Sequence, residues 1–210
     1  MAISAVMFDA AGVLTEPFSP ELAGPAIEAG ADPNVLVDVL VPLFSAGSDN
    51  GSVAGRVERG EANMEELFEA LGSDGVHARM VIDPASPTYF GHTWRPDLEM
   101  RDFVREVHAA GFATALVTNN AREWQDLWDR IVPEELPFDA RVFSWQVGSR
   151  KPEPEIYHIA AESLGVPPAE VLFMDDFEAM VVGARQVGMT AVHVADTTTS
   201  ILEARALLGL

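Results

Sequence analysis

The sequence predicts an α/β fold in which a parallel sheet carries helices on both faces and a helical segment is inserted after the first strand. An apolar run at 3–8 ends on Asp9 and is followed at once by a turn. Residues 94–210 alternate short apolar runs with amphipathic helical patterns, which is typical of covered parallel sheets. No stretch within 16–93 has the pattern of a strand. We therefore expect a Rossmann-like core of residues 1–15 and 94–210, with a small α-helical cap at 16–93.

The first apolar run, residues 3–8, has apolar side chains at consecutive positions, as the buried strands of parallel sheets do. Asp9 would lie at the carboxyl end of this strand, where open α/β sheets bind their ligands. A carboxylate in this place can act as a nucleophile, as a metal ligand or as the cap of a turn. The strand by itself leaves these three roles open.

Several stretches of the inserted segment have helical periodicity. Between Met64 and Leu71, for example, apolar residues recur at i, i+3, i+4 and i+7, the spacing of one helix face. Asp32-Pro33 has the form of a helix start. The helices expected here cover residues 22–29, 35–44, 53–60, 64–71 and, as a shorter element, 76–82, with a loop at 45–51.

From Trp94 onward the pattern alternates between strands and helices. Glycines at 111, 165 and 188 follow helical stretches, and glycine is the residue on which helices most often end. The strands expected in this part cover residues 113–117, 141–143, 171–174 and 190–194. The expected helices are one between Asp97 and Gly111 and four more at 124–131, 153–164, 178–187 and 199–208.

The composition limits the possible partners. A net charge of −20 on 210 residues argues strongly against nucleic acid or anionic membranes as partners, because both need a basic surface. The chain has no cysteine, so it has neither disulfides nor thiolate metal sites. It lacks an apolar run of about 18 residues and a signal-type start, and we expect a cytoplasmic protein. A site for an anion would need a metal ion, backbone amides and a few cations, and Lys151 is the single lysine of the chain.

Polar side chains recur where the predicted strands end. They are Asp9, Thr118, Asn119, Asn120, Asp175 and Asp176. Lys151 directly precedes a predicted helix start. Because the carboxyl ends of parallel strands lie at one edge of the sheet, these groups are expected to converge. Taken singly, each of them has an ordinary alternative as a helix cap or a solvated charge.

Four segments in this order resemble the motifs of the haloacid dehalogenase-like hydrolase superfamily. They are FDAAGVL at 8–14, LVTNN at 116–120, RKPEPEIY at 150–157 and FMDD at 173–176, the last accompanied by Gly188-Met189. The sequence is most similar to the branch with a small helical cap, which includes the N-terminal phosphatase domain of soluble epoxide hydrolase and small sugar-phosphate phosphatases. Glu58-Arg59-Gly60-Glu61 within the cap also resembles that branch.

The resemblance implies a phosphatase acting on a small phosphorylated metabolite. By this resemblance Asp9 is the nucleophile and forms an aspartyl-phosphate, and Lys151 pairs with the nucleophile and the transferred group. Thr118 would bind a phosphoryl oxygen, with Asn119 and Asn120 also binding substrate. Fixed cations of this kind stabilise the charge that builds on phosphoryl oxygens.

The resemblance also implies a Mg²⁺ cofactor. Its ligands would be the carboxylates of Asp9, Asp175 and Asp176 and the backbone carbonyl of Ala11. Oxygen ligands of this kind are the ones that Mg²⁺ prefers. The expected assembly is a monomer or a homodimer.

The sequence departs from the family at one position that matters for mechanism. Phosphatases of the superfamily usually carry a second aspartate two residues after the nucleophile as general acid and base, and this chain has Ala11 there. General acid–base catalysis is worth about 10²–10⁴ in rate, so turnover would be slow or specialised. Thr15, Glu16 and His92 are conceivable replacements.

Four functions follow from this departure. The first is a Mg²⁺-dependent phosphatase that uses another acid or good leaving groups, and the second is a protein that binds phosphorylated ligands with little turnover. The third is a 2-haloacid dehalogenase, against which Ala11 and the Asp175-Asp176 pair both count. The fourth is a phosphonoacetaldehyde hydrolase. That reaction needs a lysine in the cap, and its absence from 16–93 excludes this function.

The cap offers few candidates for substrate contacts. Arg56 and Arg59 can meet a substrate anion or can form surface pairs with Glu58 and Glu61. Two aromatic side chains, Phe18 and Phe44, can line an apolar pocket.

Overall fold

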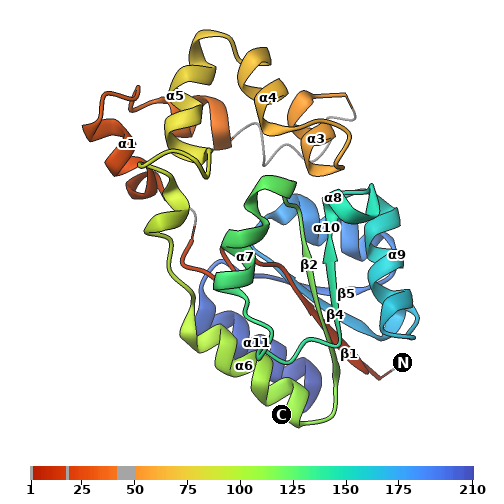
Figure 1. Cartoon of the computed structure of the whole chain (residues 1–210). Helices are drawn as coiled ribbons and strands as arrows, with labels where there is room; N and C mark the ends of the chain where they lie inside the picture. Colours follow the sequence, from red (N-terminus) through yellow and green to blue (C-terminus); the bar gives the residue numbers. More distant parts are fainter. Residues whose placement is uncertain (1, 18, 42–50) are drawn as a thin grey trace.

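The computed structural model describes residues 2–17, 19–41 and 51–210. Its core is a five-stranded parallel sheet with the order β3-β2-β1-β4-β5 (Figure 1). The strands are β1 (Ala5–Phe8), β2 (Ala113–Thr118), β3 (Ala140–Phe143), β4 (Val171–Asp175) and β5 (Thr190–His193). β1 pairs with β2 and β4, which aligns Phe8 with Leu116 and Met174. The segments that follow these strands therefore emerge side by side.

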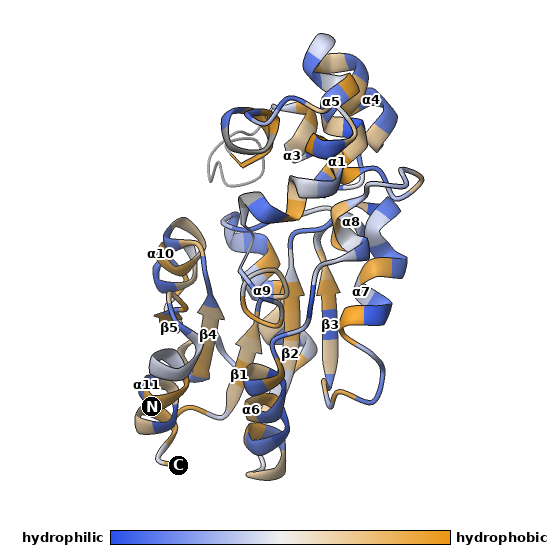
Figure 2. Ribbon diagram, turned by 90° about the vertical axis from the view of Figure 1, so that its left-hand side faces the viewer, coloured by the Kyte–Doolittle hydropathy of each residue, from blue (hydrophilic) through white to orange (hydrophobic). Residues whose placement is uncertain are grey.

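The sheet is covered on both faces, as the sequence predicts. Side chains of β1 alternate between two apolar clusters, with Val6 and Phe8 in one and Ala5 and Met7 in the other. The first cluster includes α6 (Leu98–Ala109), α7 (Gln125–Ile131) and α11 (Thr197–Leu208). The second includes α9 (Pro154–Ser163) and α10 (Glu178–Gln186). In Figure 2 the strands carry apolar colours, while the covering helices alternate apolar and polar positions.

The described residues of 16–93 form helices and turns without a strand, and we propose this segment as the cap. Its helices are η1 (Pro20–Ala23), α1 (Gly24–Glu28), η2 (Val35–Leu40), α3 (Val53–Glu58), α4 (Met64–Ala70), α5 (Ser73–Ile82) and η3 (Phe90–His92). They lie beyond the carboxyl ends of the strands (Figure 1). The cap therefore faces the edge of the sheet where the predicted polar residues converge.

Several elements differ from the sequence-based expectation. The expected helix at 35–44 is a π-helical turn over Val35–Leu40 where it is described, and residues 42–44, most of the loop at 45–51 and both Phe18 and Phe44 lie outside the described residues. Short elements were missed, because one helical turn has no full apolar period to recognise. They are α8 (Ser144–Val147), η4 (Arg122–Trp124) and η5 (Pro168–Glu170).

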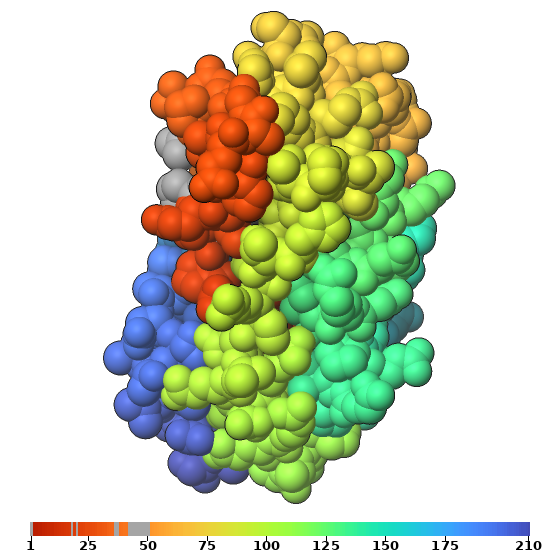
Figure 3. Space-filling model, turned by 60° about the vertical axis from the view of Figure 1, so that its left-hand side comes forward, coloured from red at the N-terminus to blue at the C-terminus, as the bar shows by residue number. Residues whose placement is uncertain are grey.

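Two adjacent segments join the cap to the core. Thr15 forms an isolated antiparallel bridge with Pro96, and the indole nitrogen of Trp94 donates a hydrogen bond to the backbone oxygen of Glu16 at 2.8 Å. Figure 3 shows these segments side by side on the surface between the upper and lower parts of the molecule. The entry and exit of the cap are thus tied to each other. No helix in the described part of the chain has the length and apolarity to cross a bilayer.

Candidate active site

A cavity of about 360 Å³ lies where the cap meets the carboxyl edge of the sheet. Its polar lining consists of Asp9, Glu58, Asn119, Lys151 and Asp176. Ala11 also lines it, and the remaining lining residues are apolar or aromatic: Pro17, Leu40, Val41, Ile82, Phe90, Trp94, Trp124, Trp128, Phe177 and Met180. The polar groups are thus few and face a largely apolar wall.

The loop after β1 places Asp9 at this cavity. The backbone amide of Asp9 donates to the carbonyl of Met174 at 2.9 Å, which continues the pairing of β1 with β4 by one residue. Gly12 has a φ of +72°, and a Cβ atom there would lie 2.1 Å from Oδ2 of Asp176. Only glycine allows both this turn and this approach without displacing the carboxylate. The glycine of the motif therefore brings the loops after β1 and β4 together.

Lys151 joins the nucleophile candidate to the end of β4. Its Nζ lies 2.8 Å from Oδ1 of Asp9 and 2.6 Å from Oδ2 of Asp175. Its side chain is buried, which by itself lowers its pKa, but the carboxylates of Asp175 and Asp9 outweigh burial and the pKa of Lys151 is raised. The lysine therefore stays charged and holds both carboxylates.

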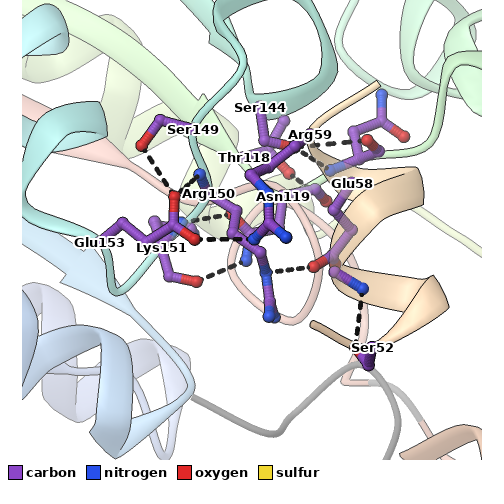
Figure 4. Close-up of polar contacts among 12 residues, drawn as sticks. Ser52, Glu58, Arg59, Thr118, Asn119, Ser144, Ser149, Arg150, Lys151 and Glu153 are labelled. Atoms are coloured by element: carbon purple, nitrogen blue, oxygen red, sulfur yellow. Dashed lines mark hydrogen bonds and ion pairs between the residues drawn. The ribbon is translucent and has the colours of Figure 1, made fainter. Parts of the chain in front are cut away.

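Asn119 fixes the backbone of Lys151. The amide of Lys151 donates to Oδ1 of Asn119 at 2.7 Å, and Nδ2 of Asn119 donates to the carbonyl of Lys151 at 2.9 Å (Figure 4). A residue after β2 thus positions the lysine that neutralises the residues after β1 and β4. This contact is the physical reason for an asparagine next to Thr118.

Three carboxylates meet at the floor of the cavity. Asp9, Asp175 and Asp176 each offer an oxygen atom within 4.8 Å of the others. Burial, and then the charge of Asp9, raise the pKa of Asp175 to about 7 and that of Asp176 to about 8, although Lys151 opposes both shifts. Three carboxylates facing one lysine leave an excess of negative charge that a divalent cation would neutralise.

The acidic cluster fits a Mg²⁺ ion in its donor set. Oδ1 of Asp176 is buried without a hydrogen-bond partner, and Asp176 lines the cavity. A buried carboxylate oxygen without a partner is the kind of atom that a divalent cation would bind. Both oxygens of Asp175 have partners, because Oδ2 faces Lys151 and Oδ1 accepts from the amide of Phe177 at 2.9 Å. Asp175 thus sits behind Lys151, while Asp9 and Asp176 face the cavity.

Two further predicted residues lie behind the cavity wall. The hydroxyl of Thr118 is buried and donates to the carbonyl of Asn119 at 3.3 Å. The backbone amide of Asn120 donates to Oγ of Ser144 at 2.9 Å, and the side-chain amide of Asn120 is buried without a hydrogen-bond partner. Neither side chain lines the cavity, so the structure separates Thr118 and Asn120 from Asn119 in this respect.

Glu58 of α3 is a functional candidate that the sequence-based reasoning missed. The prediction of a surface pair between Glu58 and a cap arginine is wrong, because Glu58 is 3% exposed and its Oε2 lies 2.5 Å from Nε of Arg150 in the core (Figure 4). The pair between Arg59 and Glu61 is present, as one of the two alternatives for these arginines had it, and Arg59 also pairs with Glu153. The helical spacing could have indicated that Glu58 is buried. It lies four residues after Ala54, and the two side chains share the buried face of α3.

The suggested replacements for an acid at position 11 lie elsewhere. The hydroxyl of Thr15 is buried, accepts a hydrogen bond from the amide of Gly12 at 2.8 Å and donates to the carbonyl of Glu16 at 2.9 Å. Glu16 and His92 are exposed. None of these three side chains lines the cavity.

The chain is similar to known proteins of one hydrolase family. The model of the haloacid dehalogenase-like hydrolase family matches residues 3–188. The sesquiterpene phosphatase astK of Aspergillus oryzae is 29% identical over 185 residues, which are 84% of this chain and 90% of that protein. The bifunctional epoxide hydrolase 2 of Rattus norvegicus is 39% identical over 103 residues, which are 47% of this chain but only 19% of that protein.

A similar fold occurs among solved structures. The HAD family enzyme bt-2542 of Bacteroides thetaiotaomicron, in complex with magnesium and inorganic phosphate, has a TM-score of 0.66 and 19% identity. The match covers 91% of this chain and 94% of that one. The likeness concerns the fold.

Proposed function

The chain belongs to the haloacid dehalogenase-like hydrolase family, and we propose that it is a Mg²⁺-dependent phosphatase acting on the phosphate monoester of an apolar alcohol. One observation carries this proposal: Asp9, held by Lys151 at 2.8 Å, lies with Asp176 at the polar end of an otherwise apolar cavity. The polar end suits a phosphate group, and the wall suits an apolar alcohol.

Asp9 is the nucleophile in this proposal. A carboxylate oxygen of Asp9 forms a bond to phosphorus while the bond from phosphorus to the ester oxygen breaks, which gives an aspartyl-phosphate and the alcohol. Water then attacks phosphorus and releases inorganic phosphate and the free carboxylate. Lys151 supplies a fixed positive charge beside the reacting carboxylate throughout, and Asn119 holds the backbone of Lys151 in place.

Asp9, Asp176 and the backbone carbonyl of Ala11 are the groups proposed to hold Mg²⁺, with Asp175 next to them but not a direct ligand, because both of its oxygens have partners. When bound, the ion supplies positive charge for the phosphoryl oxygens. The orphaned Oδ1 of Asp176 supports its part in this set. Asp175 contributes charge to the cluster and keeps Lys151 next to Asp9.

The apolar wall supports the choice of substrate. Among the described residues that line the cavity, Lys151 is the one cation, so a second anionic group on the substrate would find no partner there. Phe90, Trp94 and Trp128 offer aromatic surface instead, which favours a hydrophobic organic group. The name of the sesquiterpene phosphatase agrees with such a substrate.

The proposal is tested with purified protein and a panel of monoesters. We expect benzyl and prenyl monophosphates to be hydrolysed faster than sugar phosphates, and we expect activity to disappear with a chelator and return with Mg²⁺. Asp9→Asn should abolish turnover, whereas Asp102→Asn, on the exposed surface of α6, should not change it.

Two other outcomes of these assays would indicate a different function. Tight binding of phosphate esters without turnover by wild-type protein would point to a binding protein. Halide release from 2-haloacids in the absence of metal would point to a dehalogenase. Either result would overturn the proposal.

A further inference from the structure

We propose that Glu58, carried by the cap, is the acid–base catalyst of this site and replaces the aspartate that the chain lacks at position 11. This inference rests on the proposed phosphatase function. It deepens that function by assigning the proton transfers to a residue from the opposite side of the cavity.

The proposed reaction needs two proton transfers that the loop after β1 does not supply. The leaving alkoxide has to gain a proton, and the attacking water has to lose one. Ala11 lines the cavity with a methyl group that can do neither. Thr15, Glu16 and His92 do not line it.

Glu58 lines the same cavity as Asp9 and Ala11. Three carboxylates of the described residues line the cavity, and two of these, Asp9 and Asp176, belong to the acidic cluster. Glu58 is the third, and it enters from α3. Among the described residues it is thus the one cavity carboxylate outside the acidic cluster, and we assign the proton transfers to it.

The position of Glu58 is fixed relative to the core. Its Oε2 faces Nε of Arg150 (Figure 4). The next residue, Lys151, contacts Asp9. Arg59 adds a second ion pair across the same boundary, with Nη1 2.8 Å from Oε1 of Glu153. Gly60 packs so closely that a Cβ atom there would lie 2.5 Å from the carbonyl oxygen of Trp145. The end of α3 is therefore held against the segment that carries the lysine.

The pKa of Glu58 suits its two proposed roles, as the acid for the leaving alkoxide and as the base for the attacking water. Burial raises the pKa of Glu58 to about 7, although Arg150 and Lys151 act in the opposite direction, and the charge of Asp9 adds to the increase. Both forms of the carboxyl group are therefore populated near neutral pH, as an acid that becomes a base requires. The ion pair with Arg150 occupies one oxygen, and the other oxygen can carry the proton.

Each step balances in protons and electrons. As Asp9 attacks phosphorus, the ester oxygen leaves with its electron pair and takes the proton of Glu58, which gives a neutral alcohol and an ionised Glu58. Water then attacks phosphorus and gives its proton to Glu58 while the bond to Asp9 breaks. The enzyme returns to its starting state, and phosphate is released.

The first experiment compares two aromatic monoesters in Glu58→Gln and wild-type enzyme. Benzyl phosphate releases a strongly basic alkoxide, whereas p-nitrophenyl phosphate releases a weakly basic phenolate that needs no acid. We expect single-turnover cleavage of benzyl phosphate to fall by about 10²–10⁴-fold, with little change for p-nitrophenyl phosphate. Aspartyl-phosphate should accumulate with p-nitrophenyl phosphate, because its hydrolysis lacks a base. An equal loss with both esters and no accumulation would overturn the role of Glu58.

Two further variants make the result specific. Ala11→Asp in the Glu58→Gln background should restore cleavage of benzyl phosphate, because it supplies an acid from the core side. Glu61→Gln, which removes an exposed carboxylate three residues away, serves as the matched control and should behave as wild type. Failure of Ala11→Asp to restore cleavage in a folded protein would count against the proposal.

Arg150→Gln tests the same role if Glu58→Gln does not fold. Arg150 lowers the pKa of Glu58, so its removal should move the alkaline limb of the pH–rate profile for benzyl phosphate to higher pH. An unchanged limb would overturn the proposal. If wild type and Asp9→Asn are equally inactive on every ester, the proposed function itself has failed. If wild type is active and the Glu58 variants lose all esters equally, only this inference has failed.

Discussion

The two sides of the cavity are built on different principles. The core side is a cluster of ionisable groups, Asp9, Lys151, Asp175 and Asp176, brought together by the ends of parallel strands. The cap side is apolar surface with one buried carboxylate, Glu58. Charge on the core side is organised by topology, whereas the cap side is shaped by packing. The comparison shows that the core supplies the cluster around Asp9, whereas the cap supplies Glu58 and part of the apolar wall.

Removal of Lys151 should have the largest effect on the core side. Lys151→Met leaves the carboxylates of Asp9 and Asp175 without their buried partner, which costs about 3–5 kcal/mol in the free energy of unfolding. Phosphatase activity should fall below detection. Urea unfolding with and without Mg²⁺ measures the first effect, and we expect Mg²⁺ to restore part of the stability. Arg105→Met on the exposed face of α6 is the control, and a similar loss there would contradict the assignment.

Alanine substitution of one glycine in the core and one in the cap compares the two parts of the molecule directly. Gly12 in the core and Gly30 in the cap both have positive φ, but a Cβ atom meets Asp176 at 2.1 Å in the first case and nothing within 4 Å in the second. Each alanine substitution should cost about 1–2 kcal/mol in backbone strain. Only Gly12→Ala should also weaken Mg²⁺ binding, because it displaces the carboxylate of Asp176. Calorimetric titration with Mg²⁺ checks this, and equal affinities in the two variants would contradict it.

The acidic cluster should make stability depend on pH in a direction opposite to ordinary acid denaturation. The pKa values of Asp175 and Asp176 are about 7 and about 8 in the folded protein, against an ordinary value of 3.8. The folded state therefore binds more protons than the unfolded state, so stability falls as pH rises through this range. Glu58, with a pKa of about 7, acts in the same direction, and the raised pKa of Lys151 keeps its charge in place.

Thermal unfolding of Mg²⁺-free protein below pH 7 and above pH 8 measures this dependence. The melting temperature should fall as the pH rises, and saturating Mg²⁺ should remove the part due to Asp175 and Asp176. A melting temperature that rises over the same range would contradict the electrostatic account of the core side. In Glu58→Gln, the pH dependence of the melting temperature that is due to Asp175 and Asp176, and that Mg²⁺ removes, should remain.

The core side could be predicted from the sequence, and the cap side could not. Short apolar runs give the strands, and parallel strands force Asp9, Asn119 and Asp176 to one edge whatever the details of packing. No comparable rule places Glu58, because its burial depends on how α3 packs against the loop at 149–153. The same holds for Thr118 and Asn120, which follow β2 like Asn119 but lie behind the cavity wall.

The apolar wall should respond to a new charge with a change of specificity rather than a loss of chemistry. Val41 lines the cavity and is half-buried, so Val41→Lys can place an ammonium group near the bound alcohol without burying it fully. The ratio of kcat/KM for benzyl phosphate to that for a monoester bearing a carboxylate should fall by about tenfold, equivalent to roughly 1.4 kcal/mol. Val76→Lys, on the exposed face of α5, is the control. A uniform loss with both esters would show that the cap wall supports the reacting groups themselves, and the division between the two sides would then be wrong.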